Sequence, residues 1–223
     1  GLGLPARLPV VNLKTAPEAV DVLVLLDASG ALRTPPARRA PGKLVFAARL
    51  GGFLAHAVAS VNGIAAVKVG NAPAERAVTP DETEARLRRA LEGAASATAP
   101  VDALVDAQLA GRLVYLVCDG LAFDVGQALA LDDSLSAEGG ELRVVTVISP
   151  DDRDAVGLSR NPFTGTFRDD SETAPEELIA ARDARLAAAQ FELSRRGVKM
   201  VCIAVDVTPS ELLETMNNTD FLK

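Results

Sequence analysis

Tryptophan is missing from this chain of 223 residues, and tyrosine and histidine occur once each. With only seven phenylalanines beside the one tyrosine, and a net charge of -7, the chain has few rings to stack on bases and no basic excess to neutralise phosphates. Nucleic acid is therefore not an expected partner. The single histidine, His56, lies in the middle of an expected helix, far along the chain from the acidic residues described below, so general-base catalysis by histidine is not expected either.

Long apolar runs and cysteines are also scarce. No stretch reaches the roughly 18 consecutive apolar residues that a membrane span requires, and no secretory signal opens the chain. We therefore expect a cytoplasmic protein without a membrane span. Cys118 and Cys202 each lie in a short apolar run, where a free thiol usually behaves as a small buried side chain rather than as a redox group or metal ligand.

Short apolar runs alternate with helical patterns from residue 20 onward. Runs without polar alternation predict strands that are covered on both faces, at 20–26, 63–69, 113–118, 142–148 and 199–205. The patterns between them predict helices at 43–60, 81–95, 101–109, 124–136, 175–196 and 209–216. The alternation predicts an α/β fold, a doubly wound and mostly parallel sheet with helices on both faces. We expect one domain over 20–223, preceded by an amino-terminal extension over 1–19.

Several helix ends carry capping signals. Thr79, Thr173 and Thr208 each precede a glutamate by three residues, a spacing typical of the capping box. Gly197, which follows two arginines, is expected to end the long helix that begins at residue 175.

Acidic side chains follow the expected strands. Asp27 and Ser29 come after the first strand, and Asp119 comes at the end of the third. Ligands of parallel sheets bind beyond the carboxyl ends of the strands, and Mg²⁺ prefers carboxylate and hydroxyl oxygens. These three residues are therefore a candidate magnesium half-site. The alternative is that the two aspartates only cap loops and helices.

The pattern of these residues resembles the metal-ion-dependent adhesion site of von Willebrand factor A domains. In that site an apolar strand ends in Asp-x-Ser-x-Ser, a later loop supplies a threonine, and Asp-Gly follows another strand. Here Asp27 and Ser29 match, Ala31 stands where the second serine belongs, and Asp119-Gly120 fills the last position.

The threonine of such a site is harder to place. Thr98 lies between the helices expected at 81–95 and 101–109 and is the better candidate, whereas Thr79 is already explained as a helix cap. The resemblance thus implies the ligand set Asp27, Ser29, Thr98 and Asp119.

More of the chain, from Val20 onward, is similar to a bacterial branch of these domains that is often encoded beside MoxR-type AAA+ ATPases and has no assigned function. The similarity rests on the segments VLVLLDASGAL, KLVFAARLGGFLAHAVAS, FTGTFRDDSE and RRGVKMVCIAVD. The Gly-Asp and Ile-Asp-Trp motifs that usually precede the domain are not found, so we expect a fragment or a divergent member. The resemblance implies a non-catalytic protein-protein interaction domain, with a MoxR-type ATPase as candidate partner.

Ala31 bears directly on the metal, because a methyl group cannot coordinate a cation. Binding of Mg²⁺ or Mn²⁺ is therefore expected to be weak or absent. In the family type, the partner's carboxylate completes the metal shell. Here basic residues directly after the first strand could meet an acidic partner instead. These residues are Arg33, Arg38, Arg39 and Lys43. The loop after the fourth strand offers Asp151 and Asp152 as further partner contacts, and a solvated loop is the alternative for both segments.

Two other functions stay open. A metal-dependent hydrolase or phosphatase could use the strand-end aspartates, but the chain has no Asp-x-Asp after its first strand, no phosphate-binding glycine loop and no Gly-x-Ser-x-Gly. A metal-free scaffold could bind partners through the helix at 175–196. Its apolar positions, Ile179, Leu186 and Leu193, are instead expected to face the domain's own sheet.

Overall fold

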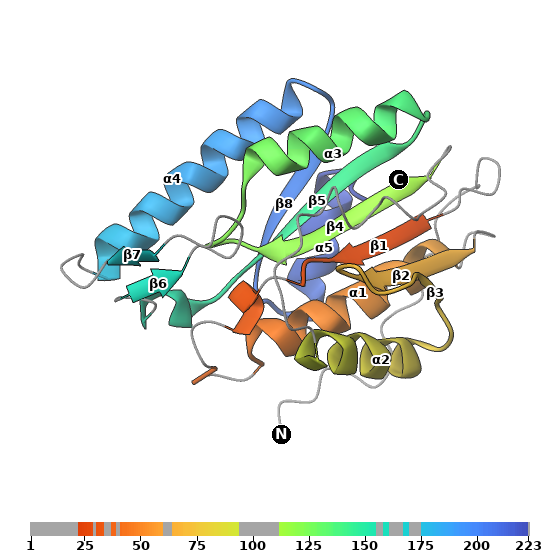
Figure 1. Cartoon of the computed structure of the whole chain (residues 1–223), viewed down its shortest axis with the longest axis horizontal. Coiled ribbons are helices and arrows are strands. Elements are labelled where there is room, and N and C mark those ends of the chain that lie inside the picture. Colours follow the sequence, from red (N-terminus) through yellow and green to blue (C-terminus); the bar gives the residue numbers. More distant parts are fainter. Residues whose placement is uncertain are drawn as a thin grey trace.

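The computed structural model describes residues 22–28, 30–33, 37–38, 41–59, 64–93, 112–154, 158–160, 167–169 and 175–222. A six-stranded sheet forms its centre, in the order β3-β2-β1-β4-β5-β8 (Figure 1). Its strands are β1 (Val22–Leu26), β2 (Ala65–Val69), β3 (Glu75–Arg76), β4 (Leu113–Asp119), β5 (Glu141–Ile148) and β8 (Lys199–Ala204). All neighbouring strands are parallel except β2 and β3. A separate antiparallel pair consists of β6 (Leu158–Arg160) and β7 (Phe167–Asp169).

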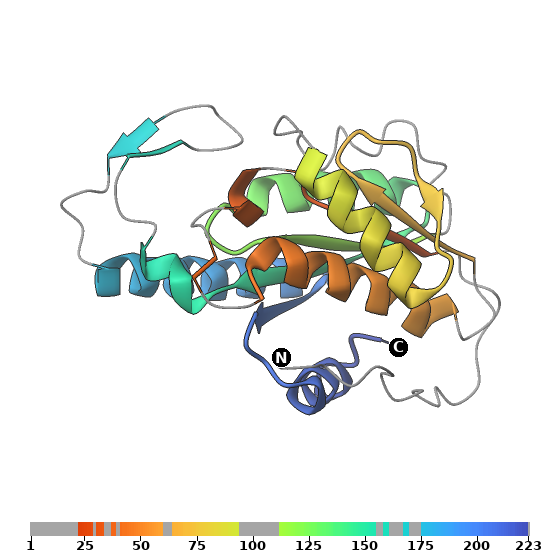
Figure 2. The same cartoon turned by 90° about the horizontal axis from the view of Figure 1, so that it is seen from below.

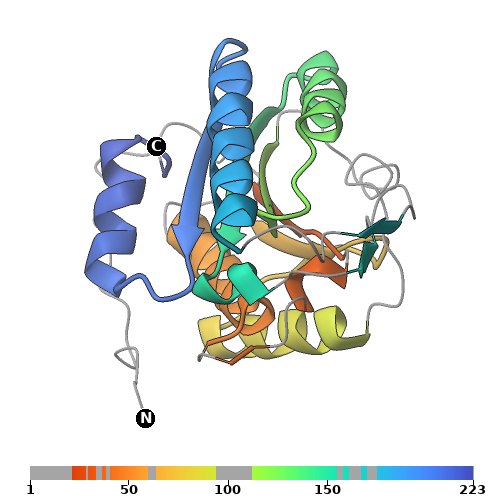
Figure 3. The same ribbon diagram turned by 90° about the vertical axis from the view of Figure 1, so that its left-hand side faces the viewer.

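Helices cover both faces of the sheet. They are α1 (Lys43–Ala59), α2 (Pro80–Gly93), α3 (Val125–Ala137), α4 (Pro175–Ser194) and α5 (Pro209–Asn218), with short 3-10 turns η1 (Gly30–Arg33) and η3 (Pro150–Asp154). Side chains of α1, α2 and α5 form one core, and side chains of α3 and α4 form the other. Figure 2 looks onto the side that carries α1 and α2, and Figure 3 shows α3 and α4 across the sheet from them. The predicted doubly wound α/β fold is confirmed.

The two cores explain why the strands show no polar alternation. In β1, Val22, Val24 and Leu26 face the core under α1, while Leu23 and Leu25 face the core under α3 and α4. All five side chains are at most 2% exposed. Because successive residues of a strand point to opposite faces, a sheet covered on both sides favours apolar residues at successive positions.

The direction of winding changes between β1 and β4. From β1 the chain continues to β2 on one side, and from β4 it continues to β5 and β8 on the other. In open α/β sheets, the crevice beyond the carboxyl ends of the strands at such a point is the usual ligand site. Asp27 follows β1 directly, and Asp119 is the last residue of β4, so the structure places both acids at this crevice.

The capping signals have mixed outcomes. Thr208 forms the predicted capping box of α5 with Glu211. At α2, the Glu82 amide donates to Thr79 Oγ1 at 3.4 Å. Gly197 adopts a φ of +83° just after α4, as expected for the residue that ends a helix. Thr173 and the helix predicted at 101–109 lie outside the described residues, as does the extension over 1–19.

The sheet edges differ from each other. At one edge, the short antiparallel β3 pairs with β2 through two residues only. At the other edge lies β8, where the Gln190 side chain donates to the Met200 carbonyl at 3.1 Å.

Cys118 in β4 is buried as predicted, but the prediction for Cys202 is wrong, because this thiol is exposed on the edge strand. None of the described helices has the length and apolarity needed to cross a membrane.

Candidate functional site

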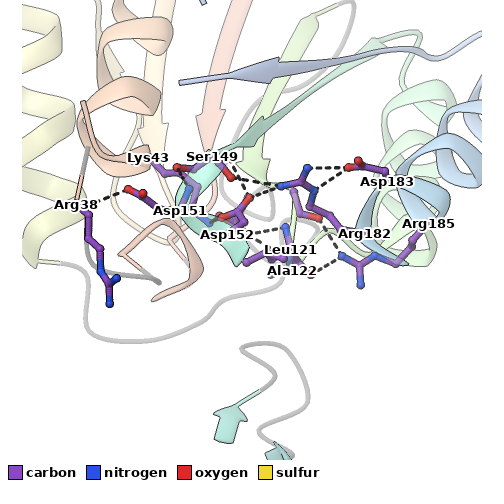
Figure 4. A network of polar contacts seen from close by, with 12 residues as sticks. Arg38, Lys43, Leu121, Ala122, Ser149, Asp151, Asp152, Arg182, Asp183 and Arg185 are labelled. Atoms are coloured by element: carbon purple, nitrogen blue, oxygen red, sulfur yellow. Dashed lines mark hydrogen bonds and ion pairs between the residues drawn. The ribbon is translucent and has the colours of Figure 1, made fainter. Parts of the chain in front are cut away.

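A lysine lies at the centre of the rim formed by the carboxyl ends of β4 and β5. Lys43 is the first residue of α1 and is buried. Its ammonium lies 2.5 Å from Asp119 Oδ2 and 2.7 Å from Asp152 Oδ1, between the two carboxylates. Figure 4 shows Lys43 together with Asp152 and Arg182. The contacts are ion pairs whose angles depart from good hydrogen-bond geometry. Both acids also lie at the amino end of α1, where the helix dipole favours negative charge.

Both oxygens of the Asp119 carboxylate are in use. Oδ1 accepts from the amides of Leu121 at 2.8 Å and Ala122 at 3.2 Å, and Oδ2 contacts Lys43. Burial raises the pKa of this carboxyl from 3.8 to about 6, and Asp152 also raises it, while the Lys43 ammonium and the Leu121 amide lower it. Asp119 is therefore mostly ionised at neutral pH.

Asp152 is held equally firmly from the other side. Its Oδ2 accepts from Arg182 Nη1 at 2.8 Å and from the Ser149 amide at 2.9 Å, and its Oδ1 contacts Lys43. Arg182 extends the chain of charges to the surface, where Nη2 pairs with Asp183 at 2.8 Å. The contact with Arg182 ties the turn η3, which carries Asp152, to α4.

We call Lys43, Asp119, Asp152 and Arg182 the buried charge network. Its two cations and two carboxylates sum to zero net charge. A buried charge without a partner costs several kcal/mol, and the four side chains neutralise one another's charge instead, although Lys43 Nζ forms no well-aligned hydrogen bond with either carboxylate. The network joins α1, β4, η3 and α4 at one point, although these elements are far apart in the sequence.

Packing and backbone contacts fix the loop after β4. Arg185 Nη2 donates to the carbonyls of Gly120 at 3.0 Å and Leu121 at 2.6 Å. A Cβ added to Gly120 would lie 2.5 Å from Ile148 Cγ2 and 3.4 Å from Leu186 Cδ1. The absence of a side chain at Gly120 therefore allows the loop after β4 to pack closely against β5 and α4.

The predicted metal ligands have unequal outcomes. Asp27 is buried, and its backbone amide donates to the Val117 carbonyl at 2.8 Å. Asp119 is paired with Lys43 as described. Ser29 and Thr98 lie outside the described residues, and Ala31 lies in η1. Within the described ranges, no group of three or more histidine, cysteine, aspartate or glutamate side chains is placed to hold a metal ion.

The predicted partner contacts are also spread over different environments. The Arg33 guanidinium donates to the Leu91 carbonyl, near the end of α2. The Arg38 side chain is exposed, and its backbone amide donates to Asp151 Oδ2 at 3.0 Å. Asp151 and Asp152 are buried, so neither carboxylate faces solvent. Arg39 lies outside the described residues.

Lys43, which the sequence suggested as one of the cations that an acidic partner could meet, is buried and paired with Asp119 and Asp152 instead. Lys43 follows a basic, proline-rich segment, and such a segment usually indicates a solvated loop. No local pattern in the sequence indicates a contact with Asp152, which is more than a hundred residues away. Arg182 was missed, although a signal exists. It falls on the helical spacing 182, 186, 189, 193 of the buried face of α4, and a charged residue on such a face requires a buried partner.

Comparisons with known proteins identify no family. No family model matches the chain, and no curated protein matches it. One match among solved structures is the crystal structure of an uncharacterised membrane spanning protein from Vibrio fischeri, which is 13% identical. The match covers 92% of this chain and 100% of that chain, with a TM-score of 0.25, a value too low to carry any argument about fold or function.

Proposed function

We propose that the chain is a non-catalytic protein-interaction domain that binds a partner at the rim formed by the carboxyl ends of β1, β4 and β5. The observation that carries the proposal is the buried charge network. All four oxygens of Asp119 and Asp152 contact groups of the protein itself, which favours a fixed binding surface over a reactive centre. A hydrolase would instead need a strand-end acid available to a substrate, water or metal ion.

The proposed partner is a MoxR-type AAA+ ATPase, with this chain as its adaptor. The support for this partner is the resemblance of the sequence to domains encoded beside such ATPases. Arg38 is a rim side chain that fits an acidic surface of the partner, because it is exposed beside η3 and α1. Bidentate pairing between arginine and carboxylate gives such a contact both strength and direction.

The test measures binding of the purified chain to the immobilised MoxR-type ATPase of the same organism by biolayer interferometry. We expect Arg38→Glu to weaken binding by about tenfold or more, because it places like charges opposite each other. The control Arg88→Glu makes the same charge change on α2, where Arg88 pairs with Glu92 in the same helix. Failure of the wild-type chain to bind would exclude this partner. Equal losses in both variants would exclude the rim as the binding surface.

A further inference from the structure

A divalent metal ion, which the resemblance implies, does not fit the residues at this rim. The ammonium of Lys43 lies between Asp119, which is one of the implied metal ligands, and Asp152, and it takes the place where a cation would contact both carboxylates. We propose that Lys43 is the resident cation of this site and takes the place of a divalent metal ion. The inference deepens the proposed function, on which its biological use rests, but it can be tested without any partner.

The position of Lys43 supports this assignment. A cation at the amino end of a helix is disfavoured by the helix dipole and by burial, so Lys43 at the start of α1 requires strong compensation. Asp119 and Asp152 provide it from β4 and η3, at distances of 2.5 and 2.7 Å. Ion and ammonium would therefore compete for the same two oxygens, Asp119 Oδ2 and Asp152 Oδ1.

The charge balance leads to the same conclusion. The two cations of the buried charge network already balance Asp119 and Asp152, so a divalent ion bound between these carboxylates would lie close to the positive charges of Lys43 and Arg182. Displacing the ammonium would also leave Lys43 buried without a partner, since its side chain is only 2% exposed. Both costs oppose metal binding in the wild-type chain.

A lysine differs from a metal ion in one functional respect, because it cannot dissociate. The rim therefore keeps the same charge and shape at any metal concentration. We infer that partner binding at this rim is insensitive to chelators. In a metal-dependent adhesion site, by contrast, the ion itself links domain and partner.

The test compares Mn²⁺ binding to the wild-type chain and to Lys43→Ala by calorimetry and thermal unfolding. The wild type is expected to show no bound Mn²⁺ and no change in Tm. Lys43→Ala is expected to bind Mn²⁺ through the freed carboxylates, with a rise in Tm of about 3–6 °C when Mn²⁺ exceeds its Kd tenfold. The double variant Lys43→Ala/Asp119→Asn should lose this rise. Arg49→Ala, in the same helix, where the partly exposed Arg49 pairs with Glu84 of α2, is the control and should behave like the wild type towards Mn²⁺.

Three outcomes would overturn the inference. One is stoichiometric Mn²⁺ binding to the wild type that Asp119→Asn abolishes, since the ion would then displace Lys43. Another is a folded Lys43→Ala that binds no Mn²⁺, since the position would then not be a cation site. If Lys43→Ala does not fold alone, refolding from urea is followed by circular dichroism with and without Mn²⁺. Recovery of the native signal only with Mn²⁺ supports the inference, and no recovery overturns it.

Discussion

Two arginine-carboxylate pairs of nearly equal length allow the effect of burial to be isolated. Arg182 lies 2.8 Å from Asp152, and both side chains are at most 7% exposed. Arg88 lies 2.9 Å from Glu92, with both side chains more than half exposed. If the energetics followed distance alone, the two pairs would contribute equally to stability. Burial predicts a large difference instead.

Replacing Arg182 by methionine should lower the free energy of unfolding by about 3 kcal/mol. Breaking a buried pair by removing one partner costs roughly 3–5 kcal/mol, and the lower end applies here because Asp152 keeps Lys43 and the Ser149 amide. Arg88→Met should cost less than about 1 kcal/mol, as is usual for an exposed pair within one helix.

The assay is urea unfolding at neutral pH, followed by circular dichroism, with Asp152→Asn added to complete a double-mutant cycle. The cycle should give a coupling energy of about 1–3 kcal/mol between Arg182 and Asp152. Equal losses for Arg182→Met and Arg88→Met, or a coupling energy near zero, would refute the view that the buried charge network holds η3 and α4 together.

Three further predictions concern single residues at or near the rim. The Asp119 carboxyl, which faces Lys43 and Asp152, has a pKa near 4 in the unfolded chain and about 6 in the folded chain. Its contribution to the free energy of unfolding is therefore fully present below pH 4. It is lost as pH rises from 4 to 6, by about 3 kcal/mol, and urea unfolding across this range should show the loss in the wild type but not in Asp119→Asn. Asp124→Ala should cost about 1 kcal/mol in the same assay, because Asp124 caps α3 by accepting from two amides of its first turn; a cost near zero would count against the cap. Gly120→Ala should lower stability by about 1–3 kcal/mol, since its Cβ would overlap with β5, and unchanged stability would show that the loop has room to shift.

The sequence predicted the fold well because the fold depends on local signals. Each main strand is an apolar run, and β1, inside the sheet, is buried on both faces, so its pattern follows directly from its two cores. β3 was not predicted, because a strand of two exposed residues, Glu75 and Arg76, has no hydrophobic pattern of its own. β3 forms because the backbone groups at the edge of β2 can pair with the segment that follows β2 and runs antiparallel to it.

The candidate site could be predicted only in part. Placing Asp27 and Asp119 at adjacent strand ends requires only the order of the strands, and the structure has both there. The pairing of Lys43 with Asp152 depends on how α1 and η3 approach each other in three dimensions. The residues that flank Lys43 and Asp152 in the sequence give no pattern from which this contact between α1 and η3 could be predicted. The composition of a loop can therefore suggest a solvated cation where the fold buries one.

The short strand β3 has a consequence for self-association. An open sheet exposes unpaired amides and carbonyls at its edges, and such edges can recruit strands from other molecules and start aggregation. At the β2 edge, β3 occupies these groups with two charged, exposed residues in antiparallel orientation, which gives an incoming strand little to pair with. At the β8 edge, the Gln190 side chain occupies the carbonyl of Met200. At both margins of the sheet, some of the backbone groups that an incoming strand would use are thus already occupied.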